Sequence, residues 1–198
     1  MGIEFSSDDG QTPLDEDEKE GLKLSTISTR GELDEFEQKN IEQALVWSMR
    51  QKFGKDRILT ERFIRQLHQQ MYGDVWKWAG EFRKTNKNIG VDKYQIGIEL
   101  KMLLDDCRFW MDQQVYHDDE IAIRFKHRLV SIHCFPNGNG RHSRMMADII
   151  TEHVFNHKPF SWGGNSLVKK SELRSLYLSS IKKADAGDMD LLLDFSRS

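Results

Sequence analysis

Apolar residues recur at intervals of three and four positions through most of this chain, which is the spacing of amphipathic helices. The first such series contains Leu33, Phe36, Ile41 and Leu45, and it predicts a helix over about residues 33–52. Because the apolar side chains of an amphipathic helix share one face, we expect these four side chains to be buried.

The same spacing predicts further helices over about residues 60–71, 96–114, 141–156, 171–184 and 188–196. Another helix begins after the acidic pair Asp118 and Asp119, which suits a helix N-terminus. It must end by Phe135, because Pro136 disfavours helical geometry in the residue before it. The chain is therefore expected to be all-α.

Two segments interrupt the helical pattern. Residues 84–94 are mostly polar around Gly90, a composition typical of a β-hairpin or flap. Residues 1–24 show little periodicity, and the first twenty of them hold eight acidic residues and one basic residue. We therefore expect an acidic irregular arm over residues 1–24 and a single domain over residues 25–198.

Composition narrows the class of protein. A chain of 198 residues, 38% of them hydrophobic, is long enough for one ordinary core and is not globally disordered. No apolar run approaches the roughly 18–20 residues of a membrane helix, and no secretory leader is recognisable. Cys107 and Cys134 match no zinc-site spacing and cannot form a disulfide framework. We expect a cytoplasmic protein.

The charge is unevenly distributed. The formal net charge is −3, but the first twenty residues carry −7, which leaves +4 for the rest. A mildly basic body suits compact polyanions such as nucleotides, whereas nucleic-acid-binding domains usually carry a denser stripe of Lys and Arg. We therefore expect neither a nucleic acid nor a membrane as the partner.

The segment from His133 to Arg144 has the chemistry of an anion site. Gly138 and Gly140 lie in a loop between two predicted helices, where glycines allow backbone N–H groups to turn toward one point. The helix that follows adds its own N-terminal N–H groups and the positive end of its dipole. The segment therefore predicts a phosphate-binding loop.

Two arginines follow this loop. Arg141 and Arg144 lie three residues apart in the first turn of the next helix, and so share one face. The helix dipole disfavours cations there by about 0.3–1 kcal/mol each, so an anion should compensate. Asp148, four residues after Arg144, offers an ordinary partner for one of them. Two arginines beside a glycine loop favour a bound polyphosphate.

His133 lies at the other end of the loop. One interpretation is a hydrogen-bonded histidine at a helix C-terminus. An imidazole with an unperturbed pKa of about 6.5 is also a competent base near pH 7. Beside a phosphate site, we favour a general base that acts on an attacking hydroxyl. Cys134 is expected to be structural, because adjacent side chains diverge at a helix end.

This segment resembles the signature of the Fic (Fic/Doc) family, His-x-Phe-x-(Asp/Glu)-Gly-Asn-Gly-Arg-x-x-Arg. The fixed positions that match are His133, Phe135, Gly138, Asn139, Gly140, Arg141 and Arg144. The helical order and residues 78–83 are also similar to that family, over about residues 33–190, and most similar to the small group called mobile mystery protein B. The resemblance implies a Fic-type helical bundle with a small β-hairpin flap beside the active site.

The resemblance also implies an activity. Fic enzymes of this kind are protein adenylyltransferases, which transfer AMP from ATP, with Mg²⁺, to a Ser, Thr or Tyr hydroxyl of a target protein. By this resemblance His133 is the general base that takes the proton of the target hydroxyl. Phe135 is implied to be a core residue that anchors the loop.

The remaining signature residues are implied to bind the phosphates of ATP. The backbone amides of Gly138, Asn139 and Gly140 would bind oxygens of the α- and β-phosphates, with help from the Asn139 side chain. Arg141 would neutralise charge on the leaving phosphates. Arg144 would hold the γ-phosphate.

Asn137 departs from the signature, which has Asp or Glu at this position to hold Mg²⁺. An amide oxygen can bind Mg²⁺ but brings no negative charge, so we expect weaker metal binding. Two alternatives follow. The chain transfers another group, such as UMP, phosphate or phosphocholine, or it binds nucleotide without turnover and acts as an interaction module.

Inhibition is the last property that the resemblance implies. Many Fic proteins carry a helix with Ser/Thr-x-x-x-Glu-Gly/Asn, whose Glu pairs with the second signature arginine. Residues 28–33 are the nearest match and make Glu32 a candidate partner of Arg144, although Glu32 also suits an ordinary first-turn acid. An antitoxin-like protein is another source of inhibition. The flap is implied to hold the target segment, with Ile89 or Val91 in contact with it.

Overall fold

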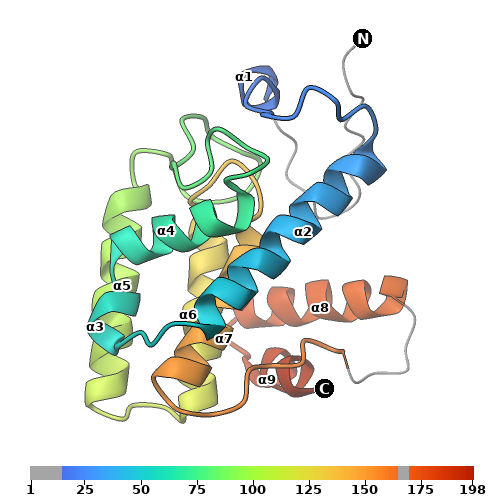
Figure 1. Ribbon diagram of the computed structural model, residues 1–198. Coiled ribbons are helices and arrows are strands. Elements are labelled where there is room, and N and C mark those ends of the chain that lie inside the picture. Colours follow the sequence, from blue (N-terminus) through green and yellow to red (C-terminus); the bar gives the residue numbers. More distant parts are fainter. Residues whose placement is uncertain (1–14, 165–169) are drawn as a thin grey trace.

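The computed structural model describes residues 15–164 and 170–198, which are mainly helical (Figure 1). The helices are α1 (Glu16–Lys19), α2 (Arg30–Met49), α3 (Lys55–Ile58), α4 (Glu61–Tyr72), α5 (Ile96–Asp112), α6 (Asp118–Ile132), α7 (Asn139–His153), α8 (Lys170–Asp185) and α9 (Asp190–Arg197). The prediction of an all-α fold is confirmed. Within the described ranges, no helix is long and apolar enough to cross a bilayer.

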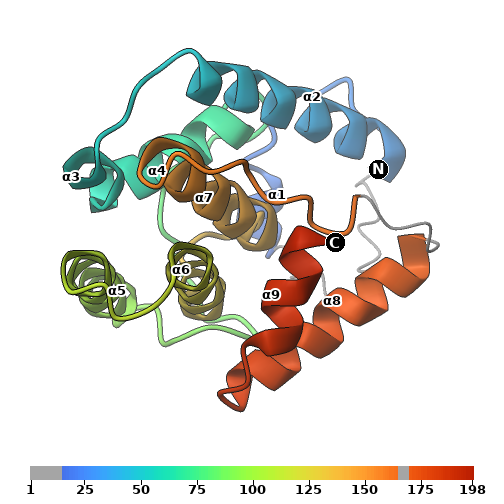
Figure 2. The ribbon, with the colours of Figure 1, turned by 90° about the horizontal axis from the view of Figure 1, so that it is seen from below.

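Helices α6 and α7 lie in the middle of the molecule, and α5 packs beside α6 at its edge. Helices α5 and α6 are seen nearly end-on in Figure 2. Helix α4 packs on α7 and α2 packs on α4, whereas α9 packs on α6 and α8 packs on α9. The interface between α6 and α7 is filled by buried apolar side chains, among them Phe125, Leu129, Met146 and Ile150. The connection from α6 to α7 therefore lies at one end of a well-packed helix pair.

Local sequence signals explain the helix boundaries near this connection. The Thr60 hydroxyl accepts a hydrogen bond from Phe63 N at 3.1 Å and caps α4. Helix α6 ends before Pro136, as predicted. Helix α7 begins at Asn139, two residues earlier than expected, because Gly138 supplies the left-handed turn that starts it.

The prediction for the buried face of α2 is confirmed for Leu33 but is wrong for two other residues. Phe36 and Leu45 are 42% and 48% exposed. The residues that α2 buries are Leu33, Glu37, Asn40, Ala44 and Ser48. The polar members of this face have partners: Asn40 donates to Gln70 O and accepts from Asp74 N, each at 2.9 Å. A polar face can be buried in this way when hydrogen bonds replace its water.

The expected β-hairpin is not formed, because residues 84–94 are an irregular loop without strand pairing. Asn86 closes this loop with its side chain. It accepts from Lys93 N at 2.8 Å and donates to Asp92 Oδ2 at 2.8 Å. Polar side chains that bond to nearby backbone compete with sheet pairing in this way. We keep the name flap for residues 84–94.

The acidic arm is described from residue 15 onward, and this part is not wholly irregular, since it begins with the short helix α1. An isolated bridge pairs Leu22 with Trp76, and Lys23 N donates to Val75 O at 2.8 Å. The described part of the arm therefore lies on the body of the molecule. Residues 1–14 of the predicted arm are outside the described residues.

Candidate active site

A tight turn joins α6 to α7. His133 has a left-handed conformation, with φ 56° and ψ 61°, and ends α6. Gly138 has φ 77° and starts α7, and a Cβ there would lie 2.5 Å from the Tyr72 ring. Only glycine combines this φ with so close a contact. The first N–H groups of α7, which have no partner within that helix, lie at the end of this turn.

The side chain of Asn139 closes the turn. Its Oδ1 accepts from Phe135 N at 2.9 Å, and its Nδ2 donates to Phe135 O at 2.8 Å. Sequence analysis assigned this side chain to the phosphates. In the structure it fixes the shape of the turn, so the backbone amide is the group that Asn139 offers to an anion.

His68 on α4 supports the turn, although sequence analysis did not identify it. Its ring stacks on the buried ring of Phe135, with the centroids 3.7 Å apart. Nδ1 accepts from Gly80 N at 3.0 Å, so the proton of the neutral ring is on Nε2, which donates to Asn137 O at 3.1 Å. Burial holds the pKa of His68 well below its usual range and keeps the ring in this neutral form. Phe135 is thus a core anchor, as the resemblance implied.

His133 is 4% exposed and lies beneath the flap. Its backbone oxygen accepts from Arg83 Nε at 2.7 Å. Burial lowers the pKa of His133 to about 4, and the positive charges of Arg83 and Lys87 act in the same direction. The ring is therefore neutral at pH 7, which is the form that a general base requires.

Different helices hold the two signature arginines. Arg141 Nη2 lies 2.7 Å from Glu37 Oε2 on α2, and its guanidinium lies over the Tyr72 ring at 5.2 Å. The Arg144 guanidinium lies over the ring of Tyr177 on α8, 5.5 Å from its centroid. Both cations are therefore held in place at the start of α7.

Glu37 is the second residue of this site that sequence analysis missed. Its side chain is buried, and its Oε1 accepts from Trp76 Nε1 at 2.7 Å. A buried carboxylate needs such partners. Glu37 binds the guanidinium of Arg141. A guanidinium binds carboxylates and phosphates in the same geometry, so Glu37 fills a position that a phosphate could take.

Asp148 was the ordinary partner considered for Arg144, and the structure gives its hydrogen bonds to another segment. Asp148 Oδ1 accepts from Phe160 N at 3.0 Å, and its carboxylate accepts from Trp162 Nε1 at 3.0 and 3.1 Å. Burial raises the pKa of Asp148 to about 6. The charge of Arg144 opposes this rise, but the hydrogen bonds of Asp148 are made to Phe160 and Trp162 and not to either arginine.

Glu32 lies in the first turn of α2 and is exposed. Its Oε2 accepts from the backbone N–H groups of Ser28 at 2.8 Å and Thr29 at 2.9 Å, and these bonds lower its pKa. This is the geometry of a helix-capping acid, the alternative that sequence analysis left open. An inhibitory contact of Glu32 with Arg144 stays a prediction that requires these bonds to break.

The two flap residues assigned to target binding differ in exposure. Ile89 is exposed, whereas Val91 is half-buried and donates from its N–H to Ile132 O at 3.3 Å. Cys134 is buried, and burial raises the pKa of its thiol to about 12. The thiol is therefore protonated at neutral pH, as expected for a structural cysteine.

The turn does not form a metal site from its own side chains. Asn137 brings one neutral oxygen, Oδ1, which accepts from Gly138 N at 2.6 Å. Among the residues that the structure describes, no three or more His, Cys, Asp or Glu side chains are arranged to hold a metal ion. Mg²⁺ prefers carboxylate and phosphate oxygens. The donor set present here therefore does not fit a resident Mg²⁺.

Comparison with known proteins places this turn in a family. The sequence model of the Fic/DOC family matches residues 58–151. The protein adenylyltransferase Fic of Aedes aegypti is 24% identical over 140 residues, and that of Drosophila grimshawi is 27% identical over 135 residues. These alignments cover 69% and 66% of this chain and 26% of each relative. The chain thus spans about a quarter of the length of these relatives.

A solved structure gives the same fold. The BepC protein of Bartonella tribocorum, a VirB-translocated effector with bound AMPPNP, superposes with a TM-score of 0.68 at 17% sequence identity. The superposition covers 91% of this chain and 95% of BepC. Residues 58–151, which match the Fic/DOC family model, contain the turn and both signature arginines.

Proposed function

We propose that this chain is a protein adenylyltransferase, which transfers AMP from ATP to a Ser, Thr or Tyr hydroxyl of a target protein. One observation carries the proposal. A single turn has the neutral His133 at one end, where α6 ends, and the N-terminus of α7 at the other. The relatives named protein adenylyltransferase and the AMPPNP bound to BepC support ATP as the donor.

His133 takes the proton of the target hydroxyl in this proposal. The hydroxyl oxygen forms a bond to the α-phosphorus of ATP, and the bond from that phosphorus to the oxygen bridging to the β-phosphate breaks. Pyrophosphate leaves with the electron pair of that bond. Protein catalysis of such transfers is mainly positioning and charge stabilisation, which a fixed turn at a helix N-terminus supplies.

The phosphates bind along the start of α7. The N–H groups of Asn139 and Gly140 bind the α- and β-phosphates, where the helix dipole favours negative charge. The N–H of Gly138 joins them only after it leaves Asn137 Oδ1. Arg141 turns from Glu37 to the leaving phosphates. Arg144 binds the γ-phosphate. Mg²⁺ would enter only with ATP, as its counterion, because the side chains of the turn do not fit a resident ion.

Asn137 favours a second candidate, a nucleotide-binding interaction module without turnover, because its Oδ1 already accepts a hydrogen bond within the turn. Incubation of a cell lysate with α-labelled ATP and the chain separates the two. Labelled target in the wild type that is lost in His133→Ala supports the enzyme. Labelling that appears only in Asn137→Asp supports the binding module.

The donor is tested in the same assay. A panel of labelled ATP, UTP, CTP and CDP-choline should give label from ATP only. Preferred transfer from another donor would replace AMP as the transferred group. Absence of label from every donor, in the wild type and in Asn137→Asp, would contradict a transferase.

A further inference from the structure

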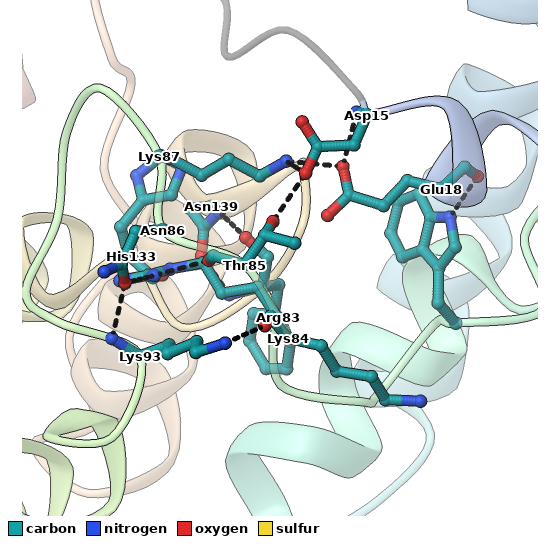
Figure 3. Close-up of polar contacts among 12 residues, drawn as sticks. Asp15, Glu18, Arg83, Lys84, Thr85, Asn86, Lys87, Lys93, His133 and Asn139 are labelled. Carbon is teal, nitrogen blue, oxygen red and sulfur yellow. Dashed lines mark hydrogen bonds and ion pairs between the residues drawn. The ribbon is translucent and has the colours of Figure 1, made fainter.

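The acidic arm and the flap are joined by contacts that the proposed reaction does not use (Figure 3). Lys87 Nζ lies 2.9 Å from Asp15 Oδ2 and 2.5 Å from Glu18 Oε2. The Thr85 hydroxyl donates to Asp15 Oδ2 at 2.5 Å. Two carboxylates from α1 and its N-cap thus bind one ammonium and one hydroxyl of the flap.

The pair formed by Lys87 and Glu18 is largely shielded from water, whereas the Asp15 side chain is 47% exposed. The Lys87 side chain is 3% exposed and that of Glu18 is 11% exposed. Removing one partner of a shielded ion pair leaves a charge without compensation, whereas exposed pairs contribute little. Hydrogen bonds from Thr85 and Lys87 hold the pKa of Asp15 below its usual range, so its carboxylate is ionised at neutral pH.

The same flap lies directly on His133. A Cβ added to Gly90 would lie 2.6 Å from His133 Cβ, so the flap backbone is in close contact with this residue. Val91 N–H donates to Ile132 O, and Arg83 Nη2 donates to Val91 O. Because this packing leaves His133 only 4% exposed, a target hydroxyl does not reach the ring in this conformation.

The arm is fixed to the body at its other side. Trp78 Nε1 donates to Glu18 O at 2.9 Å, and Lys77 N donates to Gly21 O at 2.8 Å. These bonds use backbone oxygens of the arm and leave its carboxylates to the flap. The arm is therefore a fixed support to which the flap is attached.

We propose that the acidic segment from Asp15 to Glu18 is an intramolecular lock, which holds the flap closed over His133 and must release Lys87 before a target binds. The flap then carries a binding site for an acidic peptide segment, and the chain's own arm fills it. The consequence for catalysis rests on the proposed function, whereas the closed flap itself does not.

The test measures the accessibility of His133 in the full chain. Diethyl pyrocarbonate modifies exposed imidazoles, and mass spectrometry reads the rate at each histidine. Asp15→Asn combined with Glu18→Gln removes both charges and keeps the shape and the helix cap. We expect the rate at His133 to rise about tenfold, the scale set by loss of charge-assisted hydrogen bonds.

The matched control is Glu16→Gln combined with Glu20→Gln, which removes two charges from the same segment at exposed positions. It should leave the rate at His133 unchanged. His68 and His142 are fully buried and should stay unmodified in every variant, which verifies the fold.

A charge reversal tests the pairing itself. Lys87→Glu should raise the rate at His133, and adding Asp15→Lys and Glu18→Lys to it should restore the slow rate. An unchanged rate in Asp15→Asn/Glu18→Gln, or an equal rise in the control pair, would overturn the lock. Because the readout needs neither ATP nor a target, failure of the lock and failure of the transferase are seen separately.

Discussion

At the scale of single residues, the site is shaped by polar side chains that bind one another. Arg141 is held by the carboxylate of Glu37, which a phosphate must displace. His68 is held in one tautomer by Gly80 and donates to the carbonyl of Asn137. The sequence did not reveal Glu37 or His68, because their partners lie far away along the chain. Glu37 stands among mostly polar residues and His68 is followed by two glutamines, so neither is marked out by its neighbours in the sequence.

Glu37→Gln should strengthen ATP binding. The Gln side chain keeps a carbonyl for Trp76 Nε1 but loses the charge that competes with phosphate for Arg141. We expect the dissociation constant for ATP to fall about tenfold, the scale of one charge-assisted hydrogen bond. Isothermal titration calorimetry measures it, with Glu35→Gln on the exposed face of α2 as the control. An unchanged or weaker affinity would contradict the role given to Arg141.

At the scale of elements, the position of the turn depends on the packing of α4 beneath it. Apolar periodicity and capping residues predicted α4, α5, α6 and α7 well, because these helices bury apolar faces. The same reasoning failed for part of α2, whose buried face includes Asn40, which donates to Gln70 O on α4. It also failed for the flap, where the Asn86 side chain accepts a hydrogen bond from Lys93 N and no strands pair. Periodicity reports burial of apolar groups, and these two elements are fixed by hydrogen bonds.

Gly138→Ala should destabilise the folded chain, because it disturbs the contact between the turn and α4. The added Cβ combines an unfavourable positive φ with overlap on the Tyr72 ring, a cost of about 2–4 kcal/mol. Gly97→Ala, in an open position on α5, should raise stability by up to about 1 kcal/mol. Urea denaturation measures both free energies of unfolding. Equal stability of Gly138→Ala and the wild type would show that the close contact with Tyr72 is not maintained.

At the scale of the whole molecule, buried neutral histidines make stability depend on pH. Burial lowers the pKa of His133 and His142 to about 4 and that of His68 well below its usual range. In the unfolded chain these histidines have a pKa of about 6.5. As the pH falls below this value, the unfolded chain binds protons that the folded chain does not, so the free energy of unfolding decreases. Asp148, with a raised pKa of about 6, acts in the opposite direction between about pH 6 and 4.

Three imidazoles outweigh one carboxyl group in this balance. The free energy of unfolding should therefore fall by about 2–4 kcal/mol between pH 7 and pH 5. Urea denaturation at a series of pH values measures this slope. A free energy of unfolding that stays constant or increases from pH 7 to pH 5 would mean that the three imidazole rings are hydrated or already protonated in the folded chain.

The central claim is that His133 and the turn before α7 transfer AMP, which contains the α-phosphorus of ATP, to a target protein. The most direct measurement compares α-labelled and γ-labelled ATP with a target-containing lysate, using the wild type, Asp15→Asn/Glu18→Gln and each of these with His133→Ala. We predict that protein acquires the α-label and not the γ-label, more strongly in the arm variant, and that His133→Ala abolishes it. Incorporation of the γ-label, or α-label that persists in His133→Ala, would contradict the claim.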